Sequence, residues 1–296
     1  MILSKTPYRI PLSGGGTDIS FYYKKNNAHL VSFAIDQYVF VLFSVRSIED
    51  DYFIQTTYTQ FAKNIKQIDH SLIRETLKFY NIKEKIHVGT YSTLPTGTGV
   101  GSSSAMVVGL INCINQYKKL KLSNENIIKD AYKIERIICK QYGGWQDQII
   151  SQHGGILDIK ITKREKVNIK NIKISNKLKN TIKNNLLIIY TKQKRNSSQI
   201  INSQRKNRNL IKYYNLIKSF NKPILDALKK GNIKKIGEIF NAHWILKKNL
   251  SNKITNKKID KFYTNLISRY KIIGGKLIGA GGGGFILACC KNKKKL

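Results

Sequence analysis

The sequence predicts an α+β protein with two domains. Three observations support this: strand patterns in the first third, a glycine-rich turn followed by two helix patterns, and a change of composition at residue 162. Residues 162–185 are rich in Lys and Asn and lack periodicity, and residues 186–190 then predict a buried strand that opens a second unit. Since 296 residues suffice for two ordinary domains, we expect domains at residues 1–184 and 185–296.

The first third is predicted to form strands around one helix. Residues 39–45 are apolar and β-rich, and residues 86–91 alternate between apolar and polar side chains, so both predict strands. Residues 72–80, which lie between them, predict a helix. This mixture is typical of an α+β domain.

Two helices are expected after a glycine-rich turn at residues 95–101. The first carries apolar side chains as far as Leu120, and the second runs from about residue 124 to 141. Gly143 and Gly144 follow at the place where glycine commonly ends a helix.

The composition excludes several classes of protein. With 41% hydrophobic and 10% aromatic residues the chain is neither disordered nor fibrous, and no apolar run approaches the roughly 18 residues of a membrane span. The first seven residues lack the apolar stretch of a secretory signal, so we expect a cytoplasmic protein with no membrane partner. The cysteines and histidines lack the spacing of zinc ligands, and the cysteines are expected to be core thiols: Cys113, Cys139, Cys289 and Cys290.

The charge favours a nucleic-acid partner at first sight. Fifty-three Lys and Arg against 17 Asp and Glu give a net charge of +36. The basic residues are mostly scattered Lys, accompanied by Ile and Asn, as a biased base composition of the coding sequence would produce. We therefore expect solvated faces, a solvated tail at residues 291–295 and no nucleic-acid partner. A basic nucleic-acid-binding protein stays the alternative from another class.

The most informative motif is LPTGTGVGSSSAM at residues 94–106. Its alternating glycines can turn backbone N–H groups toward an anion, and the helix opened by its serines adds a partial positive charge, so the motif predicts a phosphate cradle. It is not a Walker A loop, because no Gly-Lys-Ser/Thr follows, nor a dinucleotide fingerprint, because Ser102 replaces the third glycine. The alternative, a flexible turn capped by Ser102, explains one serine only.

A second glycine cluster lies at residues 274–288. The spacing of Gly279, Gly281 and Gly284 fits the dinucleotide pattern formally, but residues 285–290 predict a strand and no acidic residue follows. We therefore predict a strand, a glycine turn and a return strand, whose backbone approaches a ligand or another loop closely.

Two further segments carry charged residues beside glycines. Arg9 could hold a charge, and Asp18, after the glycine corner, could accept hydrogen bonds from polyol hydroxyls. Glu135 and Asp147 stand out because acidic residues are scarce. The plain alternative is that Glu135 pairs with a Lys or Arg of its own helix and that Asp147 caps the next helix.

These four segments, in this order, resemble the GHMP kinase superfamily over nearly the whole chain. The resemblance implies an N-terminal domain like the second domain of ribosomal protein S5, a ferredoxin-like C-terminal domain, and an active site in the cleft between them. It also implies a phosphotransferase that uses ATP and Mg²⁺ and has an alcohol group as acceptor. The ATP ligands would be Pro95, Gly97, Gly99, Gly101, Ser102, Ser103 and Ser104.

The resemblance also implies the roles of the charged residues. Asp147 aligns with the base that accepts a proton from a sugar hydroxyl, and Arg9 would keep it ionised and help to neutralise the transferred group. Ser103 and Glu135 align with the Mg²⁺ ligands. Lys192, Lys194 and Arg195, just past the strand at 186–190, are our candidates for holding an acceptor phosphate. The other predicted acceptor contacts are Gly14, Gly15, Gly16, Thr17, Asp18, Gly281, Gly282 and Gly283.

Within the superfamily the motifs are most similar to those of heptose 7-phosphate kinases. Galactokinases carry a Glu-His pair where this chain has Gly15 and Gly16, and the smaller residues would leave room for a longer or phosphorylated sugar. The resemblance implies phosphorylation of the anomeric hydroxyl of a heptose 7-phosphate, toward nucleotide-activated heptose for surface polysaccharide. The alternative is a kinase of an unphosphorylated sugar such as fucose or galactose. We expect a monomer or homodimer.

Overall fold

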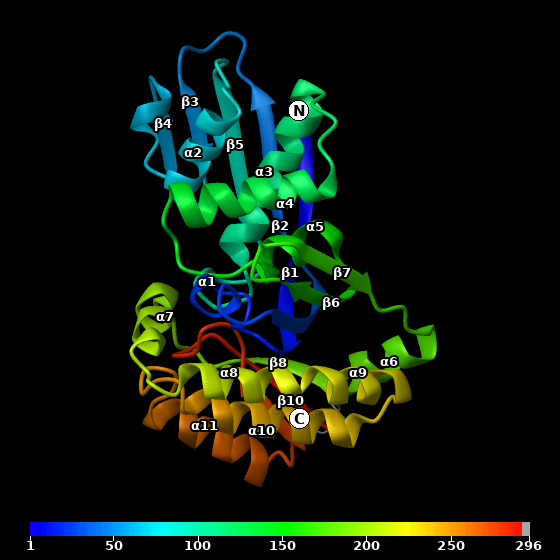
Figure 1. Ribbon diagram of the computed structural model, residues 1–296. Coiled ribbons are helices and arrows are strands. Elements are labelled where there is room, and N and C mark those ends of the chain that lie inside the picture. The colour runs from blue at the N-terminus through cyan, green and yellow to red at the C-terminus, as the bar shows by residue number, and fades with distance from the viewer. Residues whose placement is uncertain (292–296) are drawn as a thin grey trace.

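Two β-sheets lie in two lobes of the chain, one above the other in Figure 1. The computed structural model describes residues 1–291, so the predicted tail lies outside the described residues except for Lys291. The first sheet has seven strands in the order β4-β3-β5-β2-β6-β7, with β1 paired to β2, and the second has three in the order β8-β10-β9. This arrangement confirms the predicted α+β fold with two units.

The first lobe contains the large sheet and the helices that precede residue 154. Its elements are β1 (Ile2–Ser13), α1 (Ser20–Tyr23), β2 (Ala28–Val45), β3 (Tyr52–Gln55), β4 (Thr59–Ala62), the 3₁₀ turn η1 (Ile65–Gln67), α2 (Ser71–Phe79), β5 (Ile86–Ser92), α3 (Ser102–Lys118), α4 (Asn124–Tyr132), the π-helical turn η2 (Lys133–Ile138), α5 (Gln146–His153), β6 (Ile156–Ile161) and β7 (Val167–Asn171).

The second lobe contains the small sheet and the remaining helices. Its elements are α6 (Asn176–Asn185), β8 (Leu186–Tyr190), α7 (Ser197–Arg205), α8 (Leu210–Ser219), α9 (Asn221–Lys230), α10 (Ile233–Lys248), α11 (Lys257–Ser268), β9 (Gly274–Leu277) and β10 (Phe285–Cys289). The boundary near residue 184 stays a prediction.

Helix α3 lies directly on strands β1 and β2, and this contact fixes the loop before it. Ten of its residues are buried, and a Cβ at Gly109 would come within 2.7 Å of Ser4 Oγ and 2.9 Å of Thr6 Oγ1. Glycine therefore allows the helix to approach the strand closely. The glycine-rich loop at 95–101 is consequently anchored between β5 and a buried helix.

The structure confirms the predicted strands at 39–45 and 86–91 and the predicted helix at 72–80. The predicted helix at 124–141 is divided, because α4 ends at Tyr132 and a π-helical turn follows to Ile138. The prediction of an irregular segment at 162–185 is wrong. Strand β7 pairs with β6, and Ser175 caps α6 by accepting a hydrogen bond from the Leu178 N–H.

The second lobe confirms the strand, glycine turn and return strand predicted near the end of the chain. Leu277 pairs with Ile286 across β9 and β10, on either side of the turn. Strand β8 is half-buried rather than buried, because it is an edge strand and pairs only with β10. Cys113, Cys289 and Cys290 are buried, as predicted for core thiols, while Cys139 is partly exposed.

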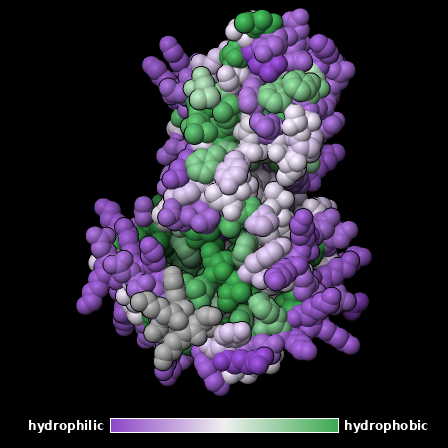
Figure 2. Space-filling model, turned by 180° about the vertical axis from the view of Figure 1, so that it is seen from behind, coloured by the Kyte–Doolittle hydropathy of each residue, from purple (hydrophilic) through white to green (hydrophobic). Residues whose placement is uncertain are grey.

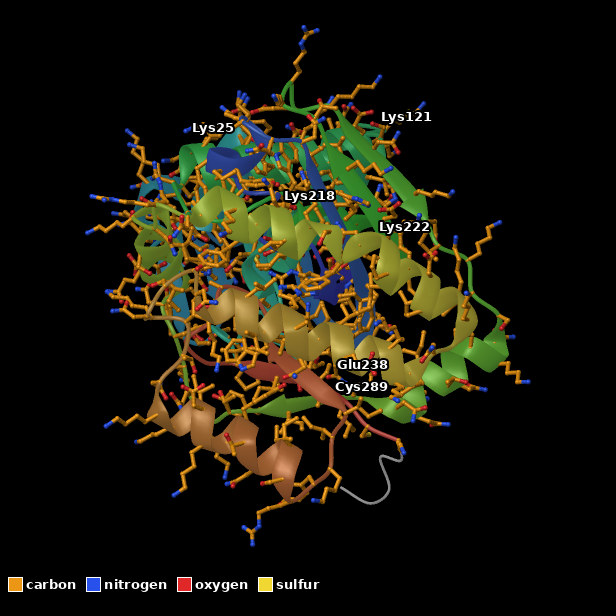
Figure 3. The ribbon with its side chains drawn as sticks, turned by 60° about the horizontal axis from the view of Figure 1, so that its bottom comes forward. Lys25, Lys121, Lys218, Lys222, Glu238 and Cys289 are labelled. Atoms are coloured by element: carbon orange, nitrogen blue, oxygen red, sulfur yellow. The ribbon has the colours of Figure 1, made fainter. Side chains whose placement is uncertain are left out.

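Basic side chains are spread over the surface. Lys25, Lys121 and Lys222 belong to different segments and do not cluster in Figure 3. Figure 2 shows hydrophilic side chains over much of both lobes, with a large apolar area in the middle of the lower lobe and smaller ones on the upper lobe. In residues 1–291 no helix is long and apolar enough to cross a bilayer.

Candidate active site

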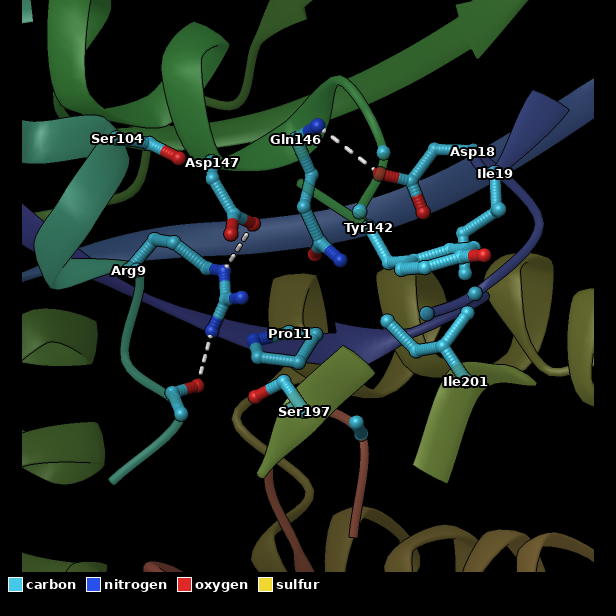
Figure 4. Close-up of a pocket in the computed structure, with 18 of the residues that line it drawn as sticks. Arg9, Pro11, Asp18, Ile19, Ser104, Tyr142, Gln146, Asp147, Ser197 and Ile201 are labelled. Atoms are coloured by element: carbon cyan, nitrogen blue, oxygen red, sulfur yellow. Dashed lines mark hydrogen bonds and ion pairs between the residues drawn. The ribbon is translucent and has the colours of Figure 1, made fainter. Parts of the chain in front are cut away.

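A pocket of about 1160 Å³, which includes the solvent at its mouth, lies where the two lobes meet. Figure 4 shows Asp147 and Gln146 of α5 on one side of it, the Arg9 guanidinium of β1 beside them, and Ser197 and Ile201 of α7 opposite. The predicted site residues that line this pocket are Arg9, Gly15, Gly16, Asp18, Gly97, Gly99, Gly101, Ser102, Ser103, Ser104, Glu135, Asp147 and Arg195.

The glycine loop has the conformation that its sequence requires. Gly97, Gly99 and Gly101 have φ angles of +74°, +85° and +85°, a region that favours glycine. Gly101 is the N-cap of α3 and Ser102 is its first helical residue, so the alternative in which Ser102 caps the helix is wrong. The positive end of α3 therefore points into the loop.

A second cavity lies on the other side of the glycine loop. It is lined by Pro95, Gly97, Ser102 and Ser103, together with side chains of β5 such as Tyr91. Since the loop borders both cavities, a ligand held by its N–H groups can extend from one cavity to the other.

Arg9 connects the glycine loop to Asp147. Its Nε donates to Asp147 Oδ1 at 2.6 Å, and its Nη1 donates to the Gly99 carbonyl at 2.5 Å. Asp147 lies in the first turn of α5, where the helix dipole stabilises a carboxylate. It does not cap the helix, because the N-cap is Trp145 and makes no side-chain cap bond. The arrangement places a carboxylate with 14% of its side chain exposed beside the predicted phosphate cradle.

Glu135 belongs to the π-helical turn η2, and both of its carboxylate oxygens have partners in a buried network. Its Oε2 accepts from Ser104 Oγ at 2.6 Å and Gln148 Nε2 at 2.7 Å, and its Oε1 pairs with Arg136 at 3.1 Å. The expectation that Glu135 pairs with a basic residue of its own helix is thus confirmed. Short π-helical turns occur often at functional sites.

Arg136 is a pocket residue that we did not predict from the sequence. Its Nη2 lies 3.8 Å from Asp147 Oδ2, so this guanidinium links Glu135 to Asp147. A Cβ at Gly143 would lie 2.4 Å from Arg136 Cζ, and glycine is therefore needed there to admit the guanidinium. The only signal in the sequence was its position directly after Glu135.

Asp18 is completely buried and lines the pocket. Its Oδ2 accepts from the Gln146 N–H at 3.0 Å, and its Oδ1 has no hydrogen-bond partner among the described residues. Burial raises the pKa of Asp18, and the negative charge of Asp147 raises it further. Asp18 therefore both positions the start of α5 and offers one oxygen to a ligand.

Two sequence models of one family match the chain. The model described as GHMP kinases N terminal domain matches residues 64–155, and the one described as GHMP kinases C terminal matches residues 224–296, together more than half of the chain. The chain belongs to the GHMP kinase family. GHMP kinases use ATP, and this kinase is a phosphotransferase with an alcohol acceptor.

The kinase is similar to sugar kinases. It is 26% identical over 308 residues to D-glycero-alpha-D-manno-heptose 7-phosphate kinase from Campylobacter jejuni, over 99% of this chain and 91% of the relative. It is 29% identical over 219 residues to the bifunctional fucokinase/GDP-fucose pyrophosphorylase of Arabidopsis thaliana, over 70% of this chain and 20% of the relative. The crystal structure of a D-glycero-D-manno-heptose 1-phosphate kinase from Bacteriodes thetaiotaomicron shares its fold, with a TM-score of 0.80, 22% identity, and coverage of 100% and 90% of the two chains.

Several predicted acceptor contacts of the kinase lie outside the pocket. Gly14 and Thr17 shape the turn after β1, because the Thr17 hydroxyl donates to the Gly14 carbonyl at 2.7 Å. Gly16 reaches the pocket, but a Cβ there would meet Tyr214 Cε1 at 2.6 Å, so its space is already filled. At Gly15 a Cβ would meet only Pro11, at 3.4 Å, and the predicted room for a larger sugar is confined to this position.

The C-terminal glycines do not contact the acceptor side of the pocket. A Cβ at Gly281, Gly282 or Gly283 would collide with Ile254, Ile200 or Gln193, respectively, and only Gly279 and Ala280 of this turn line the pocket. A Cβ at Gly284 would lie 2.1 Å from the Thr98 carbonyl oxygen. The turn thus packs against the glycine loop, which is the close backbone approach that its composition predicted.

The predicted phosphate ligands do not converge. Arg195 lines the pocket, Lys194 lines the cavity on the other side of the glycine loop, and Lys192 lines neither of these cavities. Two lysines that we did not single out, Lys247 of α10 and Lys276 of β9, line the pocket instead. A lysine among 53 basic residues gives no signal in the sequence, since only its burial distinguishes it.

Replacing Asp18 by Asn is expected to make stability less sensitive to pH. Because the pKa of Asp18 is raised by folding, the native state binds its proton more tightly than the unfolded chain, and wild-type stability falls as pH rises from about 3.9, the unfolded pKa, through the folded pKa. Urea unfolding at pH 4.5 and 7.5 measures this effect. The free energy of unfolding of Asp18→Asn, relative to that of the wild type, should be higher at pH 7.5 than at pH 4.5. If this difference between variant and wild type were the same at both pH values, or smaller at pH 7.5 than at pH 4.5, the raised pKa would be contradicted.

Proposed function

We propose that this sugar kinase phosphorylates the anomeric hydroxyl of D-glycero-D-manno-heptose 7-phosphate, which gives the 1,7-bisphosphate and ADP. The observation that carries the proposal is the Arg9 guanidinium, which holds Asp147 next to the Gly99 carbonyl of the glycine loop. The heptose 7-phosphate kinase that matches nearly the whole chain supports this choice of substrate. We place the reaction in the cytoplasm, on the route to nucleotide-activated heptose for surface polysaccharide.

The proposed mechanism uses the pocket residues as follows. The sugar hydroxyl donates its proton to Asp147 while its oxygen attacks the γ-phosphorus of ATP, and the bond to the bridging oxygen breaks to release ADP. Arg9 occupies Asp147 Oδ1, so Oδ2 is the oxygen that accepts the proton. The N–H groups of the glycine loop and the N-terminus of α3 hold the triphosphate. Asp18 Oδ1 accepts a hydrogen bond from another sugar hydroxyl.

The donor set also fits the proposed Mg²⁺. Ser103 and Glu135 line the same pocket, and three of roughly four lone-pair positions of the Glu135 carboxylate are used by Ser104, Gln148 and Arg136. One position is left, and an exposed hydroxyl at Ser103 with phosphate oxygens and water would complete an oxygen shell. Bound Mg²⁺ would neutralise the charge that develops on the phosphate oxygens.

A substrate panel tests this function. ADP release is measured with ATP, Mg²⁺ and, in turn, heptose 7-phosphate, the same heptose without phosphate, fucose, galactose and mevalonate. We expect kcat/KM for heptose 7-phosphate to exceed that for free heptose by about 10- to 100-fold, the usual contribution of hydrogen bonds to a charged group. No ADP release with any of these acceptors would refute the proposal.

The second candidate function is an anomeric kinase of an unphosphorylated sugar. The fucokinase relative, matched over 70% of the chain, favours it. In this case the panel would show equal or faster turnover of fucose or free heptose. Turnover that does not require the 7-phosphate would therefore select the second candidate.

A further inference from the structure

The wall of the pocket that comes from the second lobe carries three cationic side chains. Arg195 lies between β8 and α7, Lys247 on α10 and Lys276 on β9. Lys247 and Lys276 are only 8% and 1% exposed, although lysine is almost never buried without a charged partner. The mechanism above gives none of the three a role.

All the recorded hydrogen-bond partners of these cations are neutral. Lys247 Nζ donates to the carbonyls of Leu277 and Gly279, at 2.7 and 2.6 Å. Lys276 Nζ donates to the Leu12 carbonyl at 2.7 Å and contacts His243 Nδ1 at 3.1 Å. Arg195 Nη1 donates to the Gly281 carbonyl at 2.7 Å.

No carboxylate of the described residues pairs directly with the cluster. Burial lowers the pKa of Arg195, although the more distant charge of Asp147 favours the charged form and acts to raise that pKa. Within residues 1–291 none of the three forms an ion pair with a carboxylate, since the ion pairs in the pocket belong to Arg9 and Arg136. Carbonyl groups satisfy N–H donors but leave the cost of a buried charge. Burial, and then the positive charges of Arg195 and Lys276, lower the pKa of Lys247 well below its usual value. An anion bound among these side chains would offset both the cost of burying the positive charges and the repulsion between them.

A purely structural role explains less. Lys247 joins the end of β9 to the glycine turn through two carbonyls, and a neutral donor could do the same. A structural role of this kind does not account for three cations on one wall of a pocket. Ser197 and Ser198, the first residues of α7, line the same pocket, so the positive end of that helix also points into it.

We propose that Arg195, Lys247 and Lys276 form a second anion site in the pocket, which holds a phosphate monoester group. Arg195 adjoins the glycine loop, because a Cβ at Gly99 would lie 2.0 Å from its Nη2. Lys247 and Lys276 make their hydrogen bonds away from that loop, so the part of the site that they form is distinct from it. The inference rests on the proposed kinase function. The phosphate monoester is either the phosphate already on the acceptor or the phosphoryl group that is being transferred, and both have the same chemistry.

The binding test uses inorganic phosphate and does not depend on turnover. With the glycine loop saturated by ADP, phosphate should still raise the Tm of the wild-type kinase, because the second site stays open. The shift should disappear in Lys247→Met, which keeps the apolar stem, and persist in Lys248→Met. Lys248 is the matched control, since its side chain is 38% exposed and pairs with Asp260 on the surface.

The kinetic test distinguishes the two sources of the phosphate. If the cluster holds the acceptor's phosphate, Lys247→Met should lose about 10- to 100-fold in kcat/KM on the phosphorylated sugar and little on the unphosphorylated one. If the cluster holds the transferred group, the kcat/KM of Lys247→Met should fall by the same factor for both substrates. Lys248→Met should match the wild type in each case.

Two results would overturn the proposal. One is a wild-type kinase whose phosphate shift vanishes when ADP is bound, which needs no variant and so does not depend on Lys247→Met folding. The other is a folded Lys247→Met that keeps both the phosphate shift and its activity. A kinase that shows the shift but turns over no sugar would instead count against the proposed function alone.

Discussion

Asp147→Asn is expected to lower kcat by about 100- to 10,000-fold while nucleotide affinity stays within a factor of two or so of the wild type. The amide oxygen can still accept from Arg9 Nε, so the contact between Arg9 and the glycine loop is retained. What is lost is the oxygen that accepts the proton of the sugar hydroxyl in the proposed mechanism. Initial rates of ADP release and titration with a fluorescent ADP analogue measure the two quantities.

The matched control for this variant is Asp260→Asn. Asp260 lies in the first turn of α11 and forms a partly exposed pair with Lys248, and neither residue lines the pocket. Its kcat should equal that of the wild type, because a surface ion pair contributes little. If Asp147→Asn also retained the wild-type kcat, another residue would have to be the base.

Gly284→Ala is expected to cause the largest loss of stability among single-methyl substitutions at the site. Gly284 has a φ of +89°, and a Cβ there would lie 2.1 Å from the backbone oxygen of Thr98, which cannot rotate away as a side chain could. Left-handed strain alone costs about 1–3 kcal/mol, and the collision adds to it. We expect Tm to fall by roughly 10 °C and nucleotide affinity to fall with it, because Thr98 belongs to the glycine loop.

Gly154→Ala separates the collision from the backbone strain. Gly154 also has a positive φ, +65°, but a Cβ there would meet no atom of the described residues within 4 Å. The Tm of this variant should fall by about 2–4 °C for each kcal/mol of backbone strain, and its nucleotide affinity should equal that of the wild type. Equal losses of Tm and affinity in the two variants would show that the contact between Gly284 and Thr98 is unimportant.

Local patterns predicted those parts of the fold that local sequence determines. The strand at 86–91 and the helix at 72–80 are visible because their apolar residues repeat with the right period. Strand β7 was missed because its Lys and Asn residues carry no period, and its conformation is set by pairing with β6, which is a tertiary contact. The start of β2 at Ala28 was also missed, although its residues are mostly apolar, and β6 pairs with that part of the strand.

The site was predictable only in part. The resemblance to a family singled out Arg9 and Asp147, and the structure joins them across 138 residues of sequence. Arg136 and Lys247 could not be singled out, because charge alone does not distinguish a buried cation from a solvated one in a chain with 53 basic residues. Their positions depend on the packing of η2 and α10, which no short motif encodes.

The contact between Gly284 and Thr98 has a consequence for biosynthesis. A ribosome makes the chain from its N-terminus, so Thr98 leaves the exit tunnel long before Gly284 has been added. The first lobe can then form its sheet early, but its glycine loop meets its packing partner only when the final strand emerges. Nascent chains that stop before residue 284 would therefore fold in part without acquiring the finished nucleotide site, and enzymatic competence would come as a late event of translation.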